Sequence, residues 1–331
     1  MKYKRLVVFS GKIGYDVSGG SDATMYITAH LEDWLKIEFV CFELFDMRGR
    51  ANEVTMVVSL DELRSLLEAK NDGQTLFYGD FRDAVVLSEL RLPYIFSYHD
   101  NWPGAGIVPG TATDAKEEAI ATYAEIFRNA LYVFAVSEHS LQFIEKYTAN
   151  VKVVRNGFTK RDYTFRKTAG LNMLMIGNVD QRKYGLLPAL MAELKNNRTE
   201  VQIDVYGNLT DDFLATSLKT FEQIDLIGFR RSIDLSGYSA LLCVSYMENL
   251  PISIVEAVDA GLPVIAFDVG GISEIIDEEA GFLISPYDVK TMAHAIASLV
   301  DFGLSGIPRD LSGVYNWKLA AEGIFLTIKH L

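Results

Sequence analysis

Short apolar runs alternate with segments of helical period along most of the chain. Apolar runs of strand length in the first half lie at residues 5–11, 37–44, 53–58, 75–79, 94–99 and 131–137. Segments with apolar residues at helical spacing lie between them, at residues 21–35, 61–69, 83–90 and 116–131. Continuous apolar strands separated by helices are typical of a parallel sheet that helices cover on both faces. The first half is therefore predicted to be α/β.

The alternation stops after a short strand at residues 151–158 and a polar stretch at 159–170, and then resumes. The second half has predicted strands at residues 171–177, 201–207, 224–228, 240–245 and 263–268. Its predicted helices lie at residues 186–195, 211–221, 252–261, 289–300 and 315–331. Since a chain of 331 residues exceeds the usual size of one core, we expect two Rossmann-like parallel-sheet domains, 1–158 and 159–314, facing a cleft.

Charge and cysteine content narrow the class of protein. The sequence has 31 Lys and Arg against 44 Asp and Glu, a net charge of −13, which argues against a nucleic-acid-binding surface. Cys41 and Cys243 lie far apart in apolar runs, as buried reduced thiols do. No run approaches the ~18 apolar residues of a membrane span, and nothing supports peripheral membrane contact. We expect a cytoplasmic protein.

The segment from Ser245 to Ile276 carries the most chemistry. Glu248 and Glu256 are eight positions apart, on either side of a predicted helix start with Asn249 as the N-cap. The free N–H groups of a first helical turn favour a phosphate, and a carboxylate on each side suits hydroxyls at both ends of a diphosphate. A nucleotide-sugar has this layout. Two glutamates at this spacing could equally be a capping residue and a solvated face.

The sequel to these glutamates resembles a known family. Gly261-Leu262-Pro263-Val264, Gly270-Gly271 and Glu274 follow Glu256 as in the retaining GT-B glycosyltransferases of family 4. The resemblance implies that Glu248 binds donor-sugar hydroxyls, with Asn249 and Leu250 beside it in the donor site, and that Glu256 binds the nucleotide ribose. It also implies that the final helix, 315–331, packs back onto the first domain.

Two cations match the family's diphosphate-binding pair only in part. Lys183 matches the family's lysine, and Arg182 stands beside it, but Asn178 replaces the arginine expected directly after the strand's glycine. Arg182 compensates for that replacement or lies on a solvated loop. No Asp-x-Asp motif occurs in the chain, so we expect no metal and a metal-independent reaction.

In the first half, two features resemble the acceptor side of the family. Gly19 and Gly20 precede a helix, as in its glycine-rich loop, and are expected to let the backbone bind the donor phosphate or approach the acceptor, although a plain strand–helix turn would look the same. His99 follows a predicted strand and resembles the histidine that contacts the donor sugar, although a lone histidine is usually structural. The Gly- and Pro-rich segment 101–111 is a candidate acceptor-binding loop.

The resemblance implies transfer of a sugar from a nucleotide-diphosphate sugar, expected to be a UDP-sugar, to an acceptor hydroxyl with retention of configuration. The acceptor would be a saccharide, a lipid-linked molecule or a small molecule, and no other cofactor is expected. The pathway would be bacterial-type synthesis of polysaccharide, glycolipid or glycoconjugate. Three alternatives stay open: a catalytically silent GT-B partner protein, a nucleotide-sugar epimerase, and a flavodoxin-like or dinucleotide-binding protein. The sequence has no G-x-G-x-x-G motif after its first predicted strand, which argues against the third.

Overall fold

The computed structural model describes residues 1–331 except 51–52, 104–107, 109–110, 167–169 and 303–306. The described chain divides into two compact units, and both are α/β, as the sequence predicts. The first unit contains residues 1–103, 111–157 and 314–331, and the second is built mainly from residues 158–313.

The first unit is organised around a seven-stranded parallel sheet of order β5-β3-β1-β6-β7-β8-β9. Its strands are β1 (Arg5–Phe9), β3 (Lys36–Cys41), β5 (Val54–Met56), β6 (Thr75–Gly79), β7 (Tyr94–Tyr98), β8 (Tyr132–Ala135) and β9 (Val151–Val153). Its helices are α1 (Gly19–Leu31), α2 (Leu60–Lys70), α3 (Val85–Glu89), α4 (Thr113–Asn129), α5 (Glu138–Ile144) and α11 (Trp317–His330), with a 3-10 turn η2 (Arg82–Ala84).

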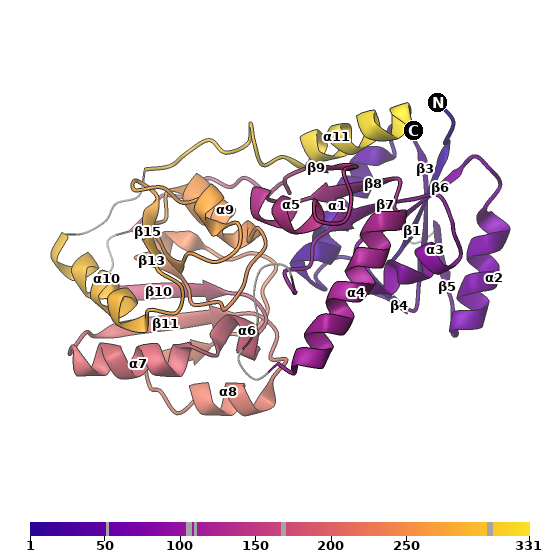
Figure 1. Ribbon diagram of the computed structural model, residues 1–331. Helices are drawn as coiled ribbons and strands as arrows, with labels where there is room; N and C mark the ends of the chain where they lie inside the picture. Colours follow the sequence, from indigo (N-terminus) through magenta and orange to yellow (C-terminus); the bar gives the residue numbers. More distant parts are fainter. Residues whose placement is uncertain (51–52, 104–107, 109–110, 167–169, 303–306) are drawn as a thin grey trace. The chain divides into compact units, whose positions relative to one another are not determined.

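The second unit has a six-stranded parallel sheet of order β12-β11-β10-β13-β14-β15. Its strands are β10 (Leu171–Ile176), β11 (Val201–Tyr206), β12 (Ile224–Leu226), β13 (Ala240–Cys243), β14 (Val264–Phe267) and β15 (Gly281–Ile284). Its helices are α6 (Gln181–Tyr184), α7 (Leu187–Asn196), α8 (Asp212–Leu218), α9 (Ile252–Ala260) and α10 (Val289–Phe302), with 3-10 turns η3 (Leu235–Gly237) and η4 (Ile272–Glu274). In Figure 1, α9 and α7 lie on opposite sides of these strands.

Two predicted strands end at least three residues earlier than the sequence suggests. The run at 37–44 is divided, because the N–H groups of Phe42 and Glu43 donate to the Gly11 carbonyl rather than to β1. The short strands β2 (Lys12–Ile13) and β4 (Glu43–Leu44) form a separate pair there. The run at 151–158 is strand only as far as Val153.

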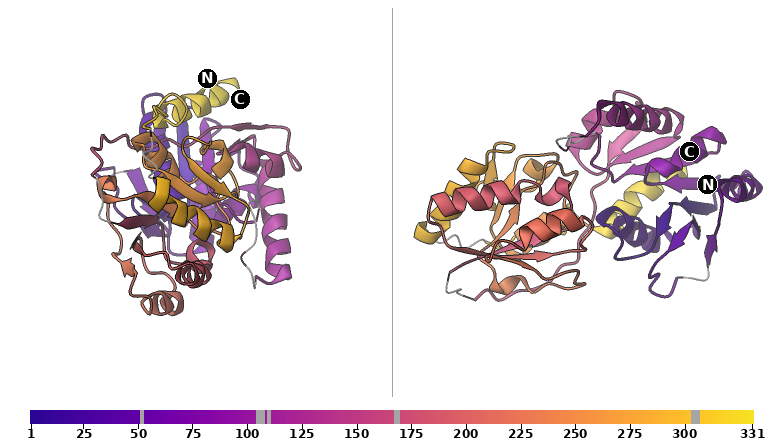
Figure 2. Two further views of the ribbon diagram at one scale, coloured as in Figure 1. Left: turned by 90° about the vertical axis from the view of Figure 1, so that its left-hand side faces the viewer. Right: turned by 90° about the horizontal axis from the view of Figure 1, so that it is seen from below.

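The last helix, α11, packs on α1 within the first unit. Asn316 caps it by accepting the N–H groups of the second and third helical residues. Trp317 stacks on Tyr26 with ring centroids 5.1 Å apart, and Phe325 stacks on Trp34 at 4.7 Å. As a result the two chain ends lie side by side in every view (Figures 1 and 2).

Candidate functional site

The helix that follows Glu248 begins later than the sequence predicts. Pro251 is the N-cap residue of α9, with an extended ψ of 115°, and the helix starts at the next residue. Proline disfavours the helical conformation in the residue before it, which keeps the preceding chain out of the helix. The prediction that Asn249 is the N-cap is therefore wrong. Glu256 occupies the fifth helical position, little more than one turn inside the helix.

A glycine pair fixes the loop before this helix. The Asn249 carbonyl accepts the N–H of Gly271 at 2.8 Å, and both Asn249 and Leu250 are buried. Gly270 has a φ of 62°, and a Cβ there would overlap the carbonyl oxygen of Glu248. Only glycine allows the two backbones to approach so closely. The Gly270-Gly271 turn therefore sets the position of the backbone that carries Glu248.

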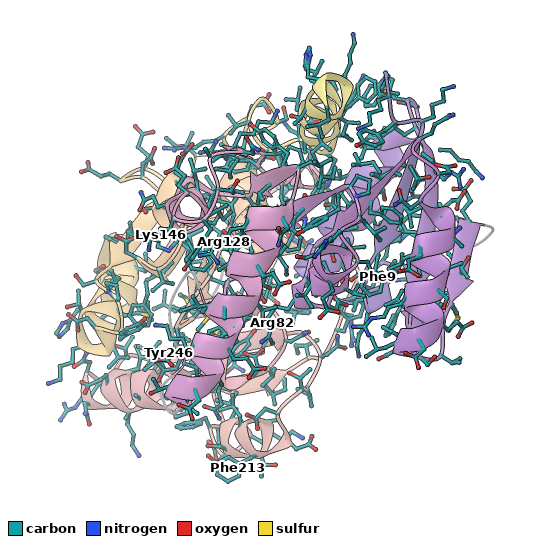
Figure 3. The ribbon with its side chains drawn as sticks, turned by 45° about the vertical axis from the view of Figure 1, so that its right-hand side comes forward. Phe9, Arg82, Arg128, Lys146, Phe213 and Tyr246 are labelled. Carbon is teal, nitrogen blue, oxygen red and sulfur yellow. The ribbon has the colours of Figure 1, made fainter. Side chains whose placement is uncertain are left out.

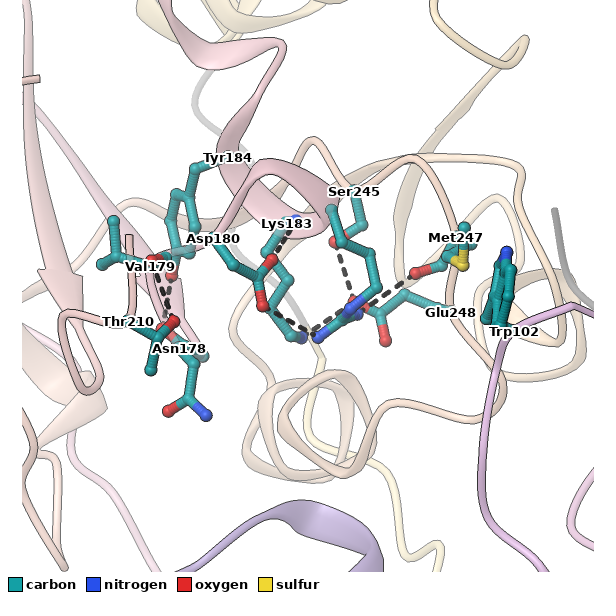
Figure 4. A network of polar contacts seen from close by, with 12 residues as sticks. Trp102, Asn178, Val179, Asp180, Lys183, Tyr184, Thr210, Ser245, Met247 and Glu248 are labelled. Carbon is teal, nitrogen blue, oxygen red and sulfur yellow. Dashed lines mark hydrogen bonds and ion pairs between the residues drawn. The ribbon is translucent and has the colours of Figure 1, made fainter. Parts of the chain in front are cut away.

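The Glu248 carboxylate lies at the centre of a polar network (Figure 4). Its Oε1 atom accepts hydrogen bonds from Lys183 Nζ and Ser245 Oγ, both at 2.8 Å, and Arg182 Nη1 lies 3.6 Å away. Burial favours the neutral carboxyl, but the charges of Lys183 and Arg182 outweigh it and lower the pKa of Glu248. At neutral pH Glu248 is therefore ionised beside two cations, and one of them, Arg182, also lies 3.7 Å from the Asp180 carboxylate.

Helix α6 supplies both cations. Asp180 caps this short helix by accepting the Lys183 N–H at 2.9 Å. Arg182 donates to the Met247 carbonyl at 3.4 Å, and its own carbonyl accepts the N–H of Tyr246 at 2.8 Å. Helix α6 is thus bound directly to the loop that carries Glu248.

Asn178 does not take part in this cluster. Its side-chain oxygen accepts a long hydrogen bond of 3.4 Å from Asn208. The cation that reaches Glu248 together with Lys183 is therefore Arg182. Its side chain is only 24% exposed, so Arg182 does not lie on a fully solvated loop.

A small pocket lies between the ends of β10 and β13 and the start of α9 within the second unit. Side chains that line it include Met175, Lys183, Cys243, Ser245, Glu248 and Ser253. Glu256, half-buried on α9, is not among the residues that line this pocket. Burial raises the pKa of Tyr163, and the charge of Glu256 also raises it. The structure therefore brings Lys183, Arg182 and Glu248 together.

The predicted residues of the first unit meet at the carboxyl edge of its sheet. Gly19 and Gly20 form the first turn of α1, which Ser18 caps. A Cβ on Gly20 would lie 3.0 Å from the Cβ of His99, whereas a Cβ on Gly19 would meet nothing within 4 Å. Gly20 thus permits the close packing of α1 against His99, and Gly19 does not serve that purpose.

His99 has an unusual environment. Both ring nitrogens are buried, and neither has a hydrogen-bond partner among the residues that the structure describes. Burial lowers the pKa of His99 to about 4, so the ring is neutral at pH 7. A neutral imidazole offers one donor and one acceptor, and buried polar atoms of this kind usually have partners. The ring is therefore an uncharged, buried group whose hydrogen-bonding capacity the described residues leave unused.

Sequence reasoning missed a pair of carboxyl groups at the same edge. Asp80 follows β6 directly, is 1% exposed, and accepts a hydrogen bond from Thr24 Oγ1 at 2.7 Å. Asp83 accepts the backbone N–H of Gly11. Burial and the charge of Asp83 raise the pKa of Asp80 to about 7. The signal was present, because two aspartates three positions apart follow a confirmed strand end.

The part of the chain that the structure describes contains no candidate metal-binding cluster and no helix suited to spanning a membrane. No group of three or more His, Cys, Asp or Glu side chains there could hold a metal ion. No helix in that part has the length and apolar character needed to cross a bilayer. Cys41 and Cys243 are both buried and not bonded to each other. Residues 104–107 and 109–110 of the candidate acceptor loop lie outside the described residues.

Comparison with known proteins connects the second unit to a family. Residues 170–301 match the family model "Glycosyl transferases group 1". Glycogen synthase from two strains of Mycobacterium tuberculosis is 26% identical over 168 residues, which are 46% of this chain and 40% of the synthase. The match thus spans about two fifths of the length of these curated relatives.

Solved structures resemble the whole chain in fold. The Anabaena protein HepE, in complex with UDP-glucose, has a TM-score of 0.78 at 17% identity, covering 99% of this chain and 100% of its own. Sucrose-phosphate synthase from Thermosynechococcus elongatus has a TM-score of 0.74 at 17% identity, covering 99% and 98%. At such identities the likeness concerns the fold. The chain therefore has the GT-B fold, with two Rossmann-like α/β units, and its residues 170–301 match the glycosyl transferases group 1 domain.

Proposed function

We propose that this protein is a retaining glycosyltransferase that moves a sugar, of hexose type, from a UDP-sugar to an acceptor hydroxyl. The second unit would bind the nucleotide-sugar and the first unit the acceptor. The observation that carries the proposal is the convergence of Lys183 and Arg182 on the buried carboxylate of Glu248. That this cluster lies in the region matching the group 1 domain supports the same conclusion.

The hydrogen bonds of the cluster suit the assigned roles. Among the described residues, Lys183 and Ser245 both donate to Oε1 of Glu248, which leaves Oε2 for a donor-sugar hydroxyl. Lys183 uses one of its three ammonium donors on Glu248, and the others are available to a phosphate oxygen. We therefore propose that Glu248 holds the sugar and that Lys183 and Arg182 hold the diphosphate.

In the proposed reaction, the bond between the anomeric carbon and the diphosphate oxygen breaks, and its electron pair stays on the diphosphate. A bond forms between that carbon and the acceptor oxygen on the same face, and the acceptor proton passes to the departing phosphate. Lys183 and Arg182 stabilise the charge that develops on the leaving group. His99 would bind sugar hydroxyls through its neutral ring, and Glu256 would bind the ribose.

The remaining features of the proposal follow from the sequence. Because the chain has no Asp-x-Asp motif, we propose that transfer needs no metal ion. Because both cysteines are free and buried, we propose a reducing, cytoplasmic compartment. The product would be a bacterial-type polysaccharide, glycolipid or glycoconjugate.

The experiment is to incubate the protein with a panel of UDP-sugars, with and without saccharide acceptors, and to measure released UDP. We expect release with at least one donor, and a fall of about 10²–10³-fold in kcat for Lys183→Met, the effect of losing one charge-stabilising donor. Lys195→Met, on the exposed end of α7, is the matched control and should keep full activity. Equal activity of both variants would refute the assignment.

A second function is favoured by one observation. Asn178 occupies the position where the family resemblance implies an arginine, and it contacts Asn208 instead. A GT-B protein without catalysis, acting as an acceptor-binding partner of another transferase, would tolerate this replacement. No UDP release with any donor, together with retained acceptor binding, would establish this alternative.

A further inference from the structure

Arg82 occupies an unusual position for an arginine in this acidic chain. It begins η2, directly beyond β6, beside helix α4 (Figure 3). Its guanidinium carbon lies 5.1 Å from the ring centroid of Trp102, and its side chain is exposed. A guanidinium that stacks on an aromatic face keeps its N–H donors free in its own plane. Trp102 therefore orients the group without consuming its hydrogen bonds.

Trp102 is itself held in place. Its backbone N–H donates to Asp100 Oδ1 at 3.2 Å, and Asp100 Oδ2 accepts the Tyr123 hydroxyl at 2.8 Å. Tyr123 is fully buried on α4. The backbone that carries Trp102 is thus linked through Asp100 to the core of the first unit, as a preorganised binding group requires.

Arg82 differs from five other arginines of the same unit, each of which has a carboxylate within ion-pair distance. These are Arg5, Arg48, Arg50, Arg64 and Arg155. In the described part of the chain, no carboxylate lies within that distance of Arg82. An oriented guanidinium in a protein of net charge −13 lowers the energy of a bound anion where the overall charge would repel it.

Arg82 and His99 follow neighbouring strands at the same edge of the sheet. Strands β6 and β7 are parallel neighbours with Gly79 paired to Phe96, so Arg82 and His99 each follow three positions beyond that pair. This edge of the sheet thus carries an exposed guanidinium in addition to the buried ring of His99. A guanidinium with free N–H groups can bind an acidic group through charge-assisted hydrogen bonds.

We propose that Arg82, oriented by Trp102, binds an acidic substituent of the acceptor, so that the acceptor is a saccharide with a carboxylate or phosphate group. This inference rests on the proposed glycosyl transfer and names its acceptor class. The acidic group takes no part in bond making; it fixes the sugar at the carboxyl edge of the first sheet.

The test is calorimetric titration of the full-length protein with glucuronic acid, glucose 6-phosphate and methyl glucoside. We expect the acidic probes to bind at least about 10-fold more tightly than the neutral one, as a charge-assisted hydrogen bond provides. Comparison of the two acidic probes distinguishes a carboxylate from a phosphate. Arg82→Gln should abolish the preference. Arg128→Gln is the matched control, because Arg128 also stacks on a ring, 5.4 Å from the centroid of Tyr147.

Two results would overturn the inference. The first is that the acidic probes bind no more tightly than methyl glucoside, with dissociation constants in the millimolar range or weaker. The second is that Arg82→Gln and Arg128→Gln change the affinity for the acidic probes equally. The thermal unfolding midpoint of Arg82→Gln shows whether that variant is folded, and Arg82→Lys, which keeps the charge, should recover part of the preference. UDP release from the donor is measured separately. Acidic-probe binding without UDP release would refute the proposed transfer and leave the anion site in place.

Discussion

Replacing Lys183 with Met should destabilise the second unit by leaving the Glu248 carboxylate buried without its nearest cation. Glu248 is 5% exposed, and Lys183 Nζ is 2.8 Å from its Oε1 atom. Breaking a buried ion pair on one side costs about 3–5 kcal/mol. Because Arg182 stays 3.6 Å away, we expect the lower end, about 3 kcal/mol.

The size of this loss should depend on pH. In the wild type the pKa of Glu248 is lowered, so the pair stabilises the fold above the unfolded carboxyl pKa and is lost as the pH falls through the folded value. Without Lys183, burial acts with less opposition and raises the pKa of Glu248 relative to the wild type. The variant can then protonate Glu248 at low pH, so the difference in stability should be larger at pH 7 than at pH 4.

The assay is urea unfolding followed by two probes. All three tryptophans, Trp34, Trp102 and Trp317, belong to the first unit, so fluorescence reports on that unit and circular dichroism on both. We expect the variant to shift the circular dichroism transition while the fluorescence transition stays in place if the units unfold separately.

A second substitution provides the internal control. Glu248→Gln removes the buried charge, so the double variant with Lys183→Met should recover most of the loss, to within about 1 kcal/mol of the wild type. A Lys183→Met protein as stable as the wild type at pH 7, or a double variant less stable than the single one, would refute the ion-pair reasoning.

Four further outcomes are expected. Asp80→Asn keeps a hydrogen-bond acceptor but cannot ionise. Because the pKa of Asp80 is raised to about 7, its carboxyl group lowers the stability of the fold as the pH rises from 4 to 8, so the variant should gain up to about 4 kcal/mol in the free energy of unfolding at pH 8 and little at pH 4. Urea titrations that show the same difference between variant and wild type at both pH values would contradict this. Glu256→Ala should weaken UDP binding about 10- to 100-fold by calorimetry, and unchanged affinity would remove the ribose assignment. Gly20→Ala should lower the thermal midpoint, because its Cβ would lie 2.7 Å from Phe81, at a cost of about 1–3 kcal/mol, while Gly19→Ala, with open space around it, should not. EDTA should leave UDP release unchanged, and loss of activity that Mn²⁺ restores would disprove metal independence.

The sequence by itself determined the α/β class and most of the order of elements, but β15, α5 and α6 were not predicted. The strand predicted at residues 75–79 is β6 with the same bounds, and the helix predicted at 252–261 is α9 to within one residue. These features depend on apolar runs and turn residues that lie close together in the chain. The position of Glu248 before a helix and of Glu256 within it could also be predicted from nearby residues. The helix begins later than predicted because Pro251 disfavours a helical conformation in the residue before it.

Only the tertiary structure decided which side chains meet. Lys183 and Glu248 are 65 positions apart and join because β10 lies beside β13 in the sheet, an order that does not follow the sequence. The burial that leaves both His99 nitrogens without described partners, and that raises the pKa of Asp80, depends on everything packed around those groups. Desolvation and long-range pairing are properties of the assembled fold, so no local pattern in the sequence could supply them.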